Sequence, residues 1–263
     1  MKTRMTLLVF VMVVSTALPA WAGEVIDSSF GDGGAILTDL EVDDEAKAVL
    51  VDGVGRVVVG GEANSYGVLL RYLSDGTPDA SFGTDGVVAI THAGGINDLA
   101  FDAAGRIVVV GSTGSGAYVA RIAESGSLDP TFGVSGVVQV TFGKAWAAGF
   151  AVAIQDDERV VLAGSAENDF AVARLLPSGD VDPTFSDDGY VIENLSELGS
   201  YATAIALDAA GNIVVAGSAG GPPVPVTFRY DPSGNIDPGF ALDENVASSV
   251  GYAFWLADAD IQA

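Results

Sequence analysis

One six-residue phrase recurs five times along this chain, and its regular spacing constrains the fold more than any other feature. The Phe of the phrase returns every 50 to 55 residues. Self-similarity at a period near fifty residues is typical of repeat architectures, propellers among them. The five copies are IDSSFG (26–31), PDASFG (78–83), LDPTFG (128–133), VDPTFS (181–186) and IDPGFA (236–241).

Each repeat predicts four short β-strands and no helix. In residues 86–127 the runs GVVAIT, INDLAFD, RIVVVGS and AYVARIAE are separated by turns that contain Gly. The third run is apolar throughout, which indicates a strand buried on both faces. Four strands in about fifty residues, with Gly at the turns, is the pattern of a propeller blade. The sequence therefore predicts an all-β fold, a β-propeller of four-stranded blades.

The phrase divides the chain into four complete repeats and one partial repeat. The complete repeats span about 26–77, 78–127, 128–180 and 181–235, and the partial fifth spans 236–263. This predicts about eighteen strands and a propeller of four or five blades. A piece of a longer array is the alternative. Closure into a ring is favoured because an open sheet edge invites aggregation.

The first 22 residues have the pattern of a signal peptide. Lys2 and Arg4 precede an apolar stretch at 5–14, and the small residues Ala20 and Ala22 offer a cleavage site after Ala22. A membrane anchor is the alternative, but the apolar stretch is too short to span a bilayer. We expect a secreted bacterial domain of residues 23–263, extracellular or periplasmic, without a membrane span after signal removal.

Composition excludes several functional classes. The chain has no cysteine, which excludes disulfides, thiolate catalysis and zinc–cysteine sites. Its net charge of −24 repels nucleic acid and anionic membrane surfaces. The expected partner is an extracellular or cell-surface ligand, and self-association through the partial repeat is a further expectation.

An arginine precedes four of the five phrases at a fixed distance. It lies eight residues before the phrase Asp and eleven before the phrase Phe. We predict a partly buried, forked ion pair between this Arg and the phrase Asp, or the same loop of a neighbouring blade. The Asp should form a turn and the Phe should fill the core. A ring of arginines lining a channel for an anionic ligand is the alternative. The predicted structural residues are Arg71, Asp79 and Phe82; Arg121, Asp129 and Phe132; Arg174, Asp182 and Phe185; and Arg229, Asp237 and Phe240.

With these residues described, the repeat is similar to a known family. The unit LDPTFGVSGVV, followed by RVVLAGS and FAVARLLPSGD, resembles the delta-60 repeat of exported bacterial proteins over about residues 26–240. The resemblance implies a β-propeller-like domain without an established biochemical activity and without catalytic residues to transfer. The departures are Ser28–Ser29 and Ala80–Ser81 in place of Pro–Thr, Ser186 in place of Gly, and a fifth copy without both glycines.

Residues capable of chemistry are few. His92 is the only histidine, so it is the only imidazole base, and we expect it in an exposed loop. No cofactor is expected apart from calcium, which prefers several oxygen ligands from one or two loops. A solvated acidic loop is the alternative reading of the same residues. The calcium candidates are Asp180, Asp182, Asp187 and Asp188.

Some aromatic residues break the repeat and are the natural place for a function specific to one unit. Phe142 and Trp146 have no counterparts in the other repeats, and Tyr252 and Trp255 break the last one. The alternative is that Trp146 fills a gap in the core and Trp255 caps the incomplete end.

No catalytic constellation is predicted. We therefore expect a non-enzymatic exported binding or interaction module of propeller type. One alternative is an extracellular hydrolase or lyase that uses carboxylates in the propeller channel as acid and base. Another is a structural surface protein that assembles through its incomplete last blade.

Overall fold

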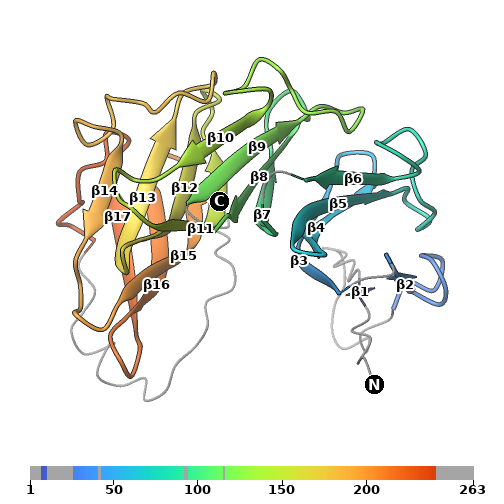
Figure 1. Ribbon diagram of the computed structural model, residues 1–263, viewed down its shortest axis with the longest axis horizontal. Helices are drawn as coiled ribbons and strands as arrows, with labels where there is room; N and C mark the ends of the chain where they lie inside the picture. Colours follow the sequence, from blue (N-terminus) through green and yellow to red (C-terminus); the bar gives the residue numbers. More distant parts are fainter. Residues whose placement is uncertain (1–6, 11–25, 41–42, 92–93, 115, 241–263) are drawn as a thin grey trace. The chain divides into compact units, whose positions relative to one another are not determined.

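A computed structural model describes residues 7–10, 26–40, 43–91, 94–114 and 116–240 (Figure 1). These residues form seventeen strands joined by turns. The described part of the chain contains no helix of the length and hydropathy needed to cross a membrane. The chain divides into two units, Met1–Ile96 and Asn97–Ala263, each described here by itself.

The first unit contains two small sheets. Strands β1 (Leu7–Phe10) and β2 (Ala35–Thr38) pair antiparallel, and β1 lies within the segment expected to be a signal peptide. The rest of that segment, 1–6 and 11–22, lies outside the described residues. The other sheet of this unit has four strands, is called the first sheet below, and does not include β1 and β2. Its strands lie in chain order: β3 (Asp44–Val51), β4 (Val57–Ala63), β5 (Tyr66–Tyr72) and β6 (Val87–Ile90).

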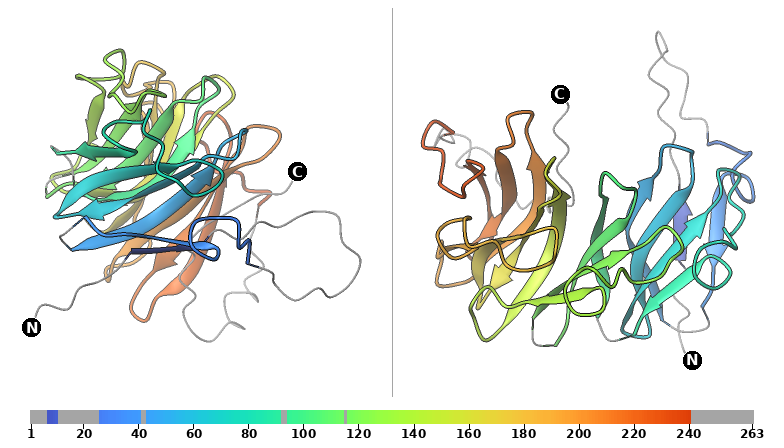
Figure 2. Two further views of the ribbon diagram at one scale, coloured as in Figure 1. Left: turned by 90° about the vertical axis from the view of Figure 1, so that its right-hand side faces the viewer. Right: turned by 90° about the horizontal axis from the view of Figure 1, so that it is seen from above.

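The second unit contains three antiparallel sheets that repeat this order (Figures 1 and 2). The second sheet has β7 (Ile96–Phe101), β8 (Ile107–Ser112), β9 (Ala117–Ile122) and β10 (Val137–Val140). The third has β11 (Ala147–Ile154), β12 (Val160–Ala166), β13 (Asp169–Leu175) and β14 (Tyr190–Glu193). The fourth has β15 (Ser200–Leu207), β16 (Ile213–Ala219) and β17 (Val224–Tyr230).

The sheets are shifted by one strand from the sequence repeat. The phrase LDPTFG joins β9 to β10, and these two strands pair within one sheet, with Ala120 opposite Val137. The phrase therefore joins two strands of one sheet and does not connect one sheet to the next. The apolar run after the phrase is the fourth strand of the same sheet, because it pairs back onto the arginine-bearing third strand and covers that strand's edge.

The core of the second unit lies between the faces of successive sheets. Val108, Val110 and Phe132 of the second sheet pack with Leu162 and Ala173 of the third. Similarly, Val161, Phe170 and Val172 of the third sheet pack with Val215 and Tyr230 of the fourth. Strands β8 and β12 are buried along both faces except at Ser112, as the continuous apolar runs predict.

A bulge in the first strand of a sheet explains one recurrent glycine. The register of β11 against β12 shifts between Gly149 and Ala151, opposite Gly164. A Cβ atom at Gly164 would lie 1.9 Å from the carbonyl oxygen of Ala148, so no side chain fits there. The same shift occurs opposite Gly61 and Gly217.

Candidate functional site

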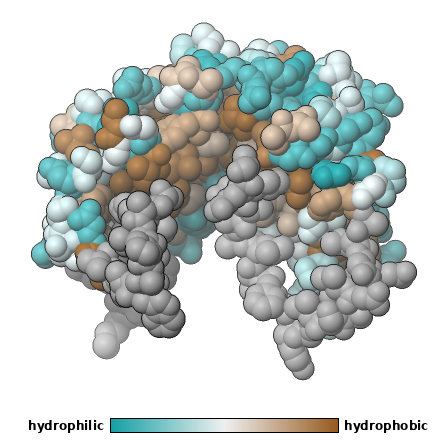
Figure 3. All heavy atoms as spheres, turned by 180° about the vertical axis from the view of Figure 1, so that it is seen from behind, coloured by the Kyte–Doolittle hydropathy of each residue, from teal (hydrophilic) through white to brown (hydrophobic). Residues whose placement is uncertain are grey.

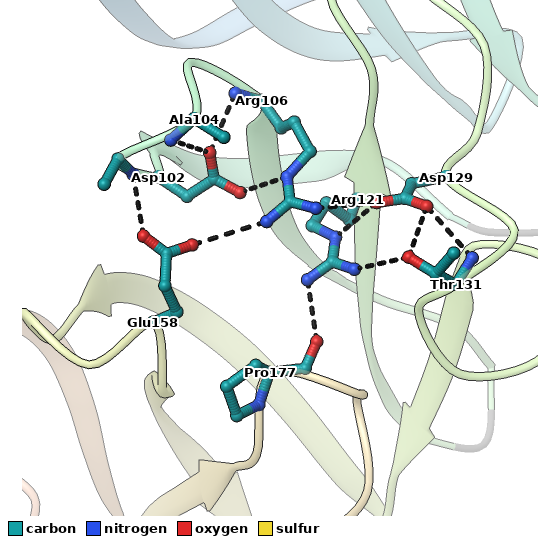
Figure 4. Close-up of polar contacts among 9 residues, drawn as sticks. Asp102, Ala104, Arg106, Arg121, Asp129, Thr131, Glu158 and Pro177 are labelled. Atoms are coloured by element: carbon teal, nitrogen blue, oxygen red, sulfur yellow. Dashed lines mark hydrogen bonds and ion pairs between the residues drawn. The ribbon is translucent and has the colours of Figure 1, made fainter.

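A network of hydrogen bonds and ion pairs surrounds the aspartate of the repeated phrase. In the third copy, Asp129 accepts hydrogen bonds at Oδ1 from the Thr131 backbone N–H (2.9 Å) and the Thr131 hydroxyl (2.7 Å). Its Oδ2 accepts a hydrogen bond of 2.8 Å from Arg121 Nε. Arg121 Nη2 donates in turn to the Thr131 hydroxyl at 3.0 Å. One turn thus forms a closed ring of hydrogen bonds (Figure 4).

The phrase Phe lies beneath the guanidinium group. Phe132 is fully buried, and Arg121 Cζ lies 4.7 Å from its ring centroid. This cation–π contact joins the polar turn to the apolar core, because the same ring packs against the neighbouring strands. Arg71, Arg174 and Arg229 lie over Phe82, Phe185 and Phe240 in the same way, at 4.3, 4.8 and 4.9 Å.

The structure brings every predicted Arg to its predicted Asp. The Nε to Oδ2 distance is 2.8 Å for Arg71–Asp79, Arg121–Asp129, Arg174–Asp182 and Arg229–Asp237. The fork differs from the expectation, however. In the first three pairs the Arg Nε donates to one carboxylate oxygen of the Asp, and Nη2 donates to the hydroxyl group of the Ser or Thr two residues after that Asp. The guanidinium therefore does not bind both carboxylate oxygens.

The third arm of the guanidinium links successive sheets of the second unit. Arg121 Nη1 donates to the carbonyl oxygen of Pro177 at 2.7 Å, and Pro177 precedes the phrase of the third sheet. Arg174 Nη1 donates to Pro232 in the same manner. Each of these arginines therefore holds its own turn closed and ties it to the next turn (Figure 4).

A second arginine, Arg106, joins the same carboxylate. Arg106 Nε pairs with Asp102 at 2.6 Å, its Nη1 reaches Asp129 at 3.1 Å, and its Nη2 reaches Glu158 at 3.4 Å. Glu158 also accepts the backbone N–H of Ala103 at 3.0 Å. The sequence does contain a signal for the Asp102–Arg106 pair. An Asp stands four residues before an Arg at both Asp52–Arg56 and Asp102–Arg106, and both pairs form in the structure.

These contacts leave little room for an anionic ligand at the arginines. Arg71, Arg121 and Arg174 are each no more than 5% exposed. Their donors are directed at a carboxylate and a hydroxyl group of the chain itself. The arrangement is suited to holding turns and sheets together, and it disfavours the alternative of an arginine-lined anion channel.

The site predicts a specific dependence of stability on pH. The Thr131 hydroxyl and backbone N–H, together with Arg121, lower the pKa of Asp129 to about 2 despite its burial. Because the ordinary pKa of Asp is about 3.9, this group stabilises the fold fully above about pH 4 and progressively less as the pH falls to about 2. Urea unfolding at a series of pH values should show this loss.

Asp129→Asn is the matched control for the pH dependence. It should remove the Asp129 contribution, so the variant should lose less of its remaining stability between about pH 4 and pH 2 than the parent. Identical slopes for the two proteins in this interval would show that Asp129 does not titrate as proposed.

The calcium candidates are not gathered into an ion site. Asp182 is 1% exposed and is engaged by Arg174 and Arg159 at 2.8 and 2.9 Å. Asp180 accepts a hydrogen bond from Ser178, and Asp188 accepts the backbone N–H of Tyr190. Within the described ranges, no three carboxylate or imidazole groups are placed to hold a metal. Calcium is therefore not supported, because the arginines already occupy the buried carboxylate.

The residues that break the repeat separate into two groups. His92, Tyr252 and Trp255 lie outside the described residues. Phe142 and Trp146 both lie in the connection from β10 to β11, where Phe142 is buried and Trp146 is 42% exposed. The alternative that Trp146 fills a core gap is therefore wrong, and Phe142 takes the buried place.

On the face drawn in Figure 3, hydrophilic residues predominate and apolar residues gather in patches.

Comparison with known proteins identifies the repeat. No curated protein matches this chain. A solved structure of a Bacteroides caccae protein of unknown function is 16% identical, with a TM-score of 0.50, and the match covers 77% of this chain and 68% of that one. A Lactobacillus plantarum protein is 12% identical with the same TM-score, over 77% of this chain and 57% of that one.

A third similar structure is virginiamycin B lyase from Staphylococcus aureus, 13% identical with a TM-score of 0.45, over 76% of this chain and 56% of that chain. At these identities the likeness shows the fold alone. The family described as "Domain of unknown function (DUF5122) beta-propeller" matches residues 55–82, 105–132, 155–185 and 211–240. The chain thus contains four matches to the DUF5122 β-propeller repeat of unknown function, consistent with its delta-60-like phrase.

Proposed function

We propose that this chain is an exported, non-enzymatic binding module of the propeller type, and that Trp146 is the centre of its binding surface. The observation that carries the proposal is an indole 42% exposed in the connection between β10 and β11, where the sequence departs from the repeat. Export is proposed because residues 1–22 have the pattern of a signal peptide, which is removed during export. A function specific to this protein is expected where its repeats differ, since the common residues are used by the scaffold.

The loop that carries Trp146 is held in place on both sides. Glu167 donates its backbone N–H to the Trp146 carbonyl at 3.0 Å, and its side chain accepts the N–H of Ala145 at 3.2 Å. Lys144 Nζ lies 3.6 Å from the Glu167 carboxylate. The backbone of Trp146 is therefore fixed while 42% of the residue is exposed.

Phe142 anchors the other end of the loop. Its ring is buried and lies 6.0 Å from the ring of Tyr190, and its φ of 52° is a conformation that a side chain of this size seldom adopts. An exposed aromatic residue on a preorganised loop is typical of binding hot spots, because little conformational entropy is lost when a partner covers it.

The test replaces Trp146 and measures the change in binding affinity. Trp146→Ala should weaken binding of the chain to an array of bacterial surface polysaccharides and envelope proteins by at least about 10-fold, since a hot-spot aromatic contributes about 2 kcal/mol or more. Trp146→Phe is the control and should retain part of the affinity. Both variants should unfold at the temperature of the parent. Undiminished binding by Trp146→Ala, or no binding by the parent, would contradict the proposal.

A second candidate function is structural assembly, and one observation favours it. Among the described residues, β17 pairs only with β16, so the fourth sheet has three strands where the other three sheets have four. A strand edge that no other strand covers is a template for pairing with another strand.

A further inference from the structure

Four connections at one end of the second unit are joined to one another by backbone hydrogen bonds. We call them the loop end: the β10–β11 loop (141–146), the β12–β13 turn (167–168), the β14–β15 loop (194–199) and the β16–β17 turn (220–223). Each bond runs from a backbone N–H at one connection to a backbone carbonyl at its neighbour: Glu167 to Trp146 at 3.0 Å, Ser200 to Asn168 at 2.7 Å, and Gly220 to Gly199 at 2.8 Å. The loop end is therefore one connected surface.

The loop end presents large apolar side chains to solvent. Trp146 and Val224, the first residue of β17, are exposed, and Leu198 is 69% exposed. Leu198 lies beside the β16–β17 turn, because a Cβ atom built on Gly221 would be 3.5 Å from Leu198 Cδ1. Exposed apolar residues within a polar surface mark protein–protein contacts. Leu and Val cannot form hydrogen bonds with the hydroxyl groups of a sugar, so the surface suits a polypeptide better than a polysaccharide.

The two longer connections of the loop end also have sequences of their own. The β10–β11 loop reads TFGKAW and the β14–β15 loop reads NLSELG. At the opposite end of the same sheets the phrases repeat, and their polar side chains hold the turns closed. The loop end therefore differs from one sheet to the next, as expected of a surface that recognises a particular partner.

Carboxylates border the exposed apolar side chains. The carboxylate of Glu167 accepts the N–H of Ala145 at 3.2 Å, so it is held beside the residue that precedes Trp146. Glu197 precedes Leu198, is exposed, and makes no side-chain hydrogen bond or ion pair with the described residues. Within the four connections Lys144 is the single Lys or Arg, and its Nζ lies 3.6 Å from Glu167. The border of the apolar surface is therefore acidic.

The chain itself has no cation to place against this border. Of its eleven Lys and Arg residues, Lys2 and Arg4 lie in the segment that the proposed export removes, and the other nine each lie in an ion pair. Arg106 and Arg121, for example, are directed at carboxylates and a carbonyl group of the chain (Figure 4). Residues 241–263 contain no Lys or Arg. Charge thus disfavours both this segment and a second copy as the partner.

We propose that the loop end binds a basic segment of another protein, in which Lys or Arg alternates with apolar residues. This inference rests on the proposed binding function of Trp146 and adds the chemistry of the partner. The partner's cations pair with Glu167 and Glu197 and lie over the Trp146 indole, and its apolar side chains cover Leu198. Lys144 opposes the same cations, because its ammonium group lies beside Glu167.

Three synthetic peptides of equal length test the charge of the partner. The probe consists of Lys-Leu-Gly repeats, and every Lys is replaced by Gln in the second peptide and by Glu in the third. The chain should bind the Lys peptide at least about 10-fold more tightly than the Gln peptide, and should not bind the Glu peptide. Affinity for the Lys peptide should fall as the ionic strength rises from about 0.05 to about 0.5 M. Fluorescence anisotropy of labelled peptides measures each Kd.

Charge variants separate the loop end from the general attraction of an acidic protein for a basic peptide. Glu197→Gln should weaken binding of the Lys peptide about 3-fold. Asp156→Asn is the matched control: it removes one exposed charge from the β11–β12 turn, at the opposite end of β11 from Trp146, and should weaken binding less. Lys144→Gln should strengthen binding about 2-fold, because it removes a competing cation. All three variants should melt at the temperature of the parent.

The outcomes distinguish this inference from the proposed function. Equal Kd values for the Lys and Gln peptides, no binding of the Lys peptide, or equal weakening by Glu197→Gln and Asp156→Asn would overturn the basic partner. Tighter binding of a neutral polysaccharide, dextran, than of the Lys peptide would overturn it as well. In each case the binding function stands if Trp146→Ala still weakens binding of whichever probe the parent binds. An unchanged Kd for Trp146→Ala with every probe would instead contradict the binding function, and the basic partner with it.

Discussion

Replacement of Arg121 by alanine should lower the free energy of unfolding by about 3–5 kcal/mol, the range expected when one member of a buried ion pair is removed. Arg121 is 4% exposed and Asp129 is 8% exposed, so water replaces the lost guanidinium group poorly, and Arg106, 3.1 Å away, is left as the cationic partner of the carboxylate. The variant also loses the hydrogen bond to Pro177, which ties the second sheet to the third. Urea unfolding followed by circular dichroism measures the change.

Arg229→Ala is the matched control for this prediction. It removes the same pair from the fifth phrase, where both side chains are about 30% exposed. Solvent screens such a pair, and the expected loss is about 0–1 kcal/mol. Arg121→Lys should recover only part of the stability, because a single ammonium group cannot reach the carboxylate, the hydroxyl and the carbonyl together. Equal losses for Arg121→Ala and Arg229→Ala would show that burial of the pair has no energetic consequence.

Replacement of Phe132 by alanine should have an effect of similar size, about 3–5 kcal/mol. The Phe132 ring is fully buried and packs among Val108, Val119 and Val140 of its own sheet and Leu162 of the next. Its removal leaves a cavity between two sheets and withdraws the ring beneath Arg121. The expected observation is a lower melting temperature together with a less cooperative transition of the second unit.

Two further variants separate the cavity from the cation–π contact. Phe132→Leu keeps most of the volume, so it should cost less than Phe132→Ala and should report chiefly the loss of the aromatic face. Phe240→Ala removes the equivalent ring from the fifth phrase, where it is only partly buried, and should cost less than Phe132→Ala. If Phe240→Ala were as damaging as Phe132→Ala, the phrase Phe would not derive its effect from packing between sheets.

The local part of the candidate site could be predicted from the sequence. The Arg and Asp of a repeat are eight residues apart in one hairpin, so their pairing depends on a short stretch of chain whose strand and turn signals were clear. The Asx turn of the phrase is local for the same reason, and Asp129 accepts the N–H only two residues ahead.

Contacts between repeats could not be predicted in the same way. Glu158 lies 52 residues from Arg106, and Pro177 lies 56 residues from Arg121. Nothing in the local pattern distinguishes Glu158 from the exposed acidic residues beside it. The same reason explains why the acidic loop suggested calcium, which the structure does not support. An acidic loop has the same sequence pattern whether its carboxylates face solvent or, as for Asp182, pair with Arg159 and Arg174.

The sequence by itself determined the all-β repeat, the four-strand unit, and the identity of the residues that close each turn. These properties follow from periodicity, turn chemistry and fixed short intervals, all of which act over a few residues. Only the tertiary structure decided which four strands form a sheet. The physical reason is that a strand can pair on either of its two edges, and the choice depends on backbone hydrogen bonds to strands far away in the chain. The fourth strand pairs back across the phrase, so each of the three four-stranded sheets combines strands from two sequence repeats.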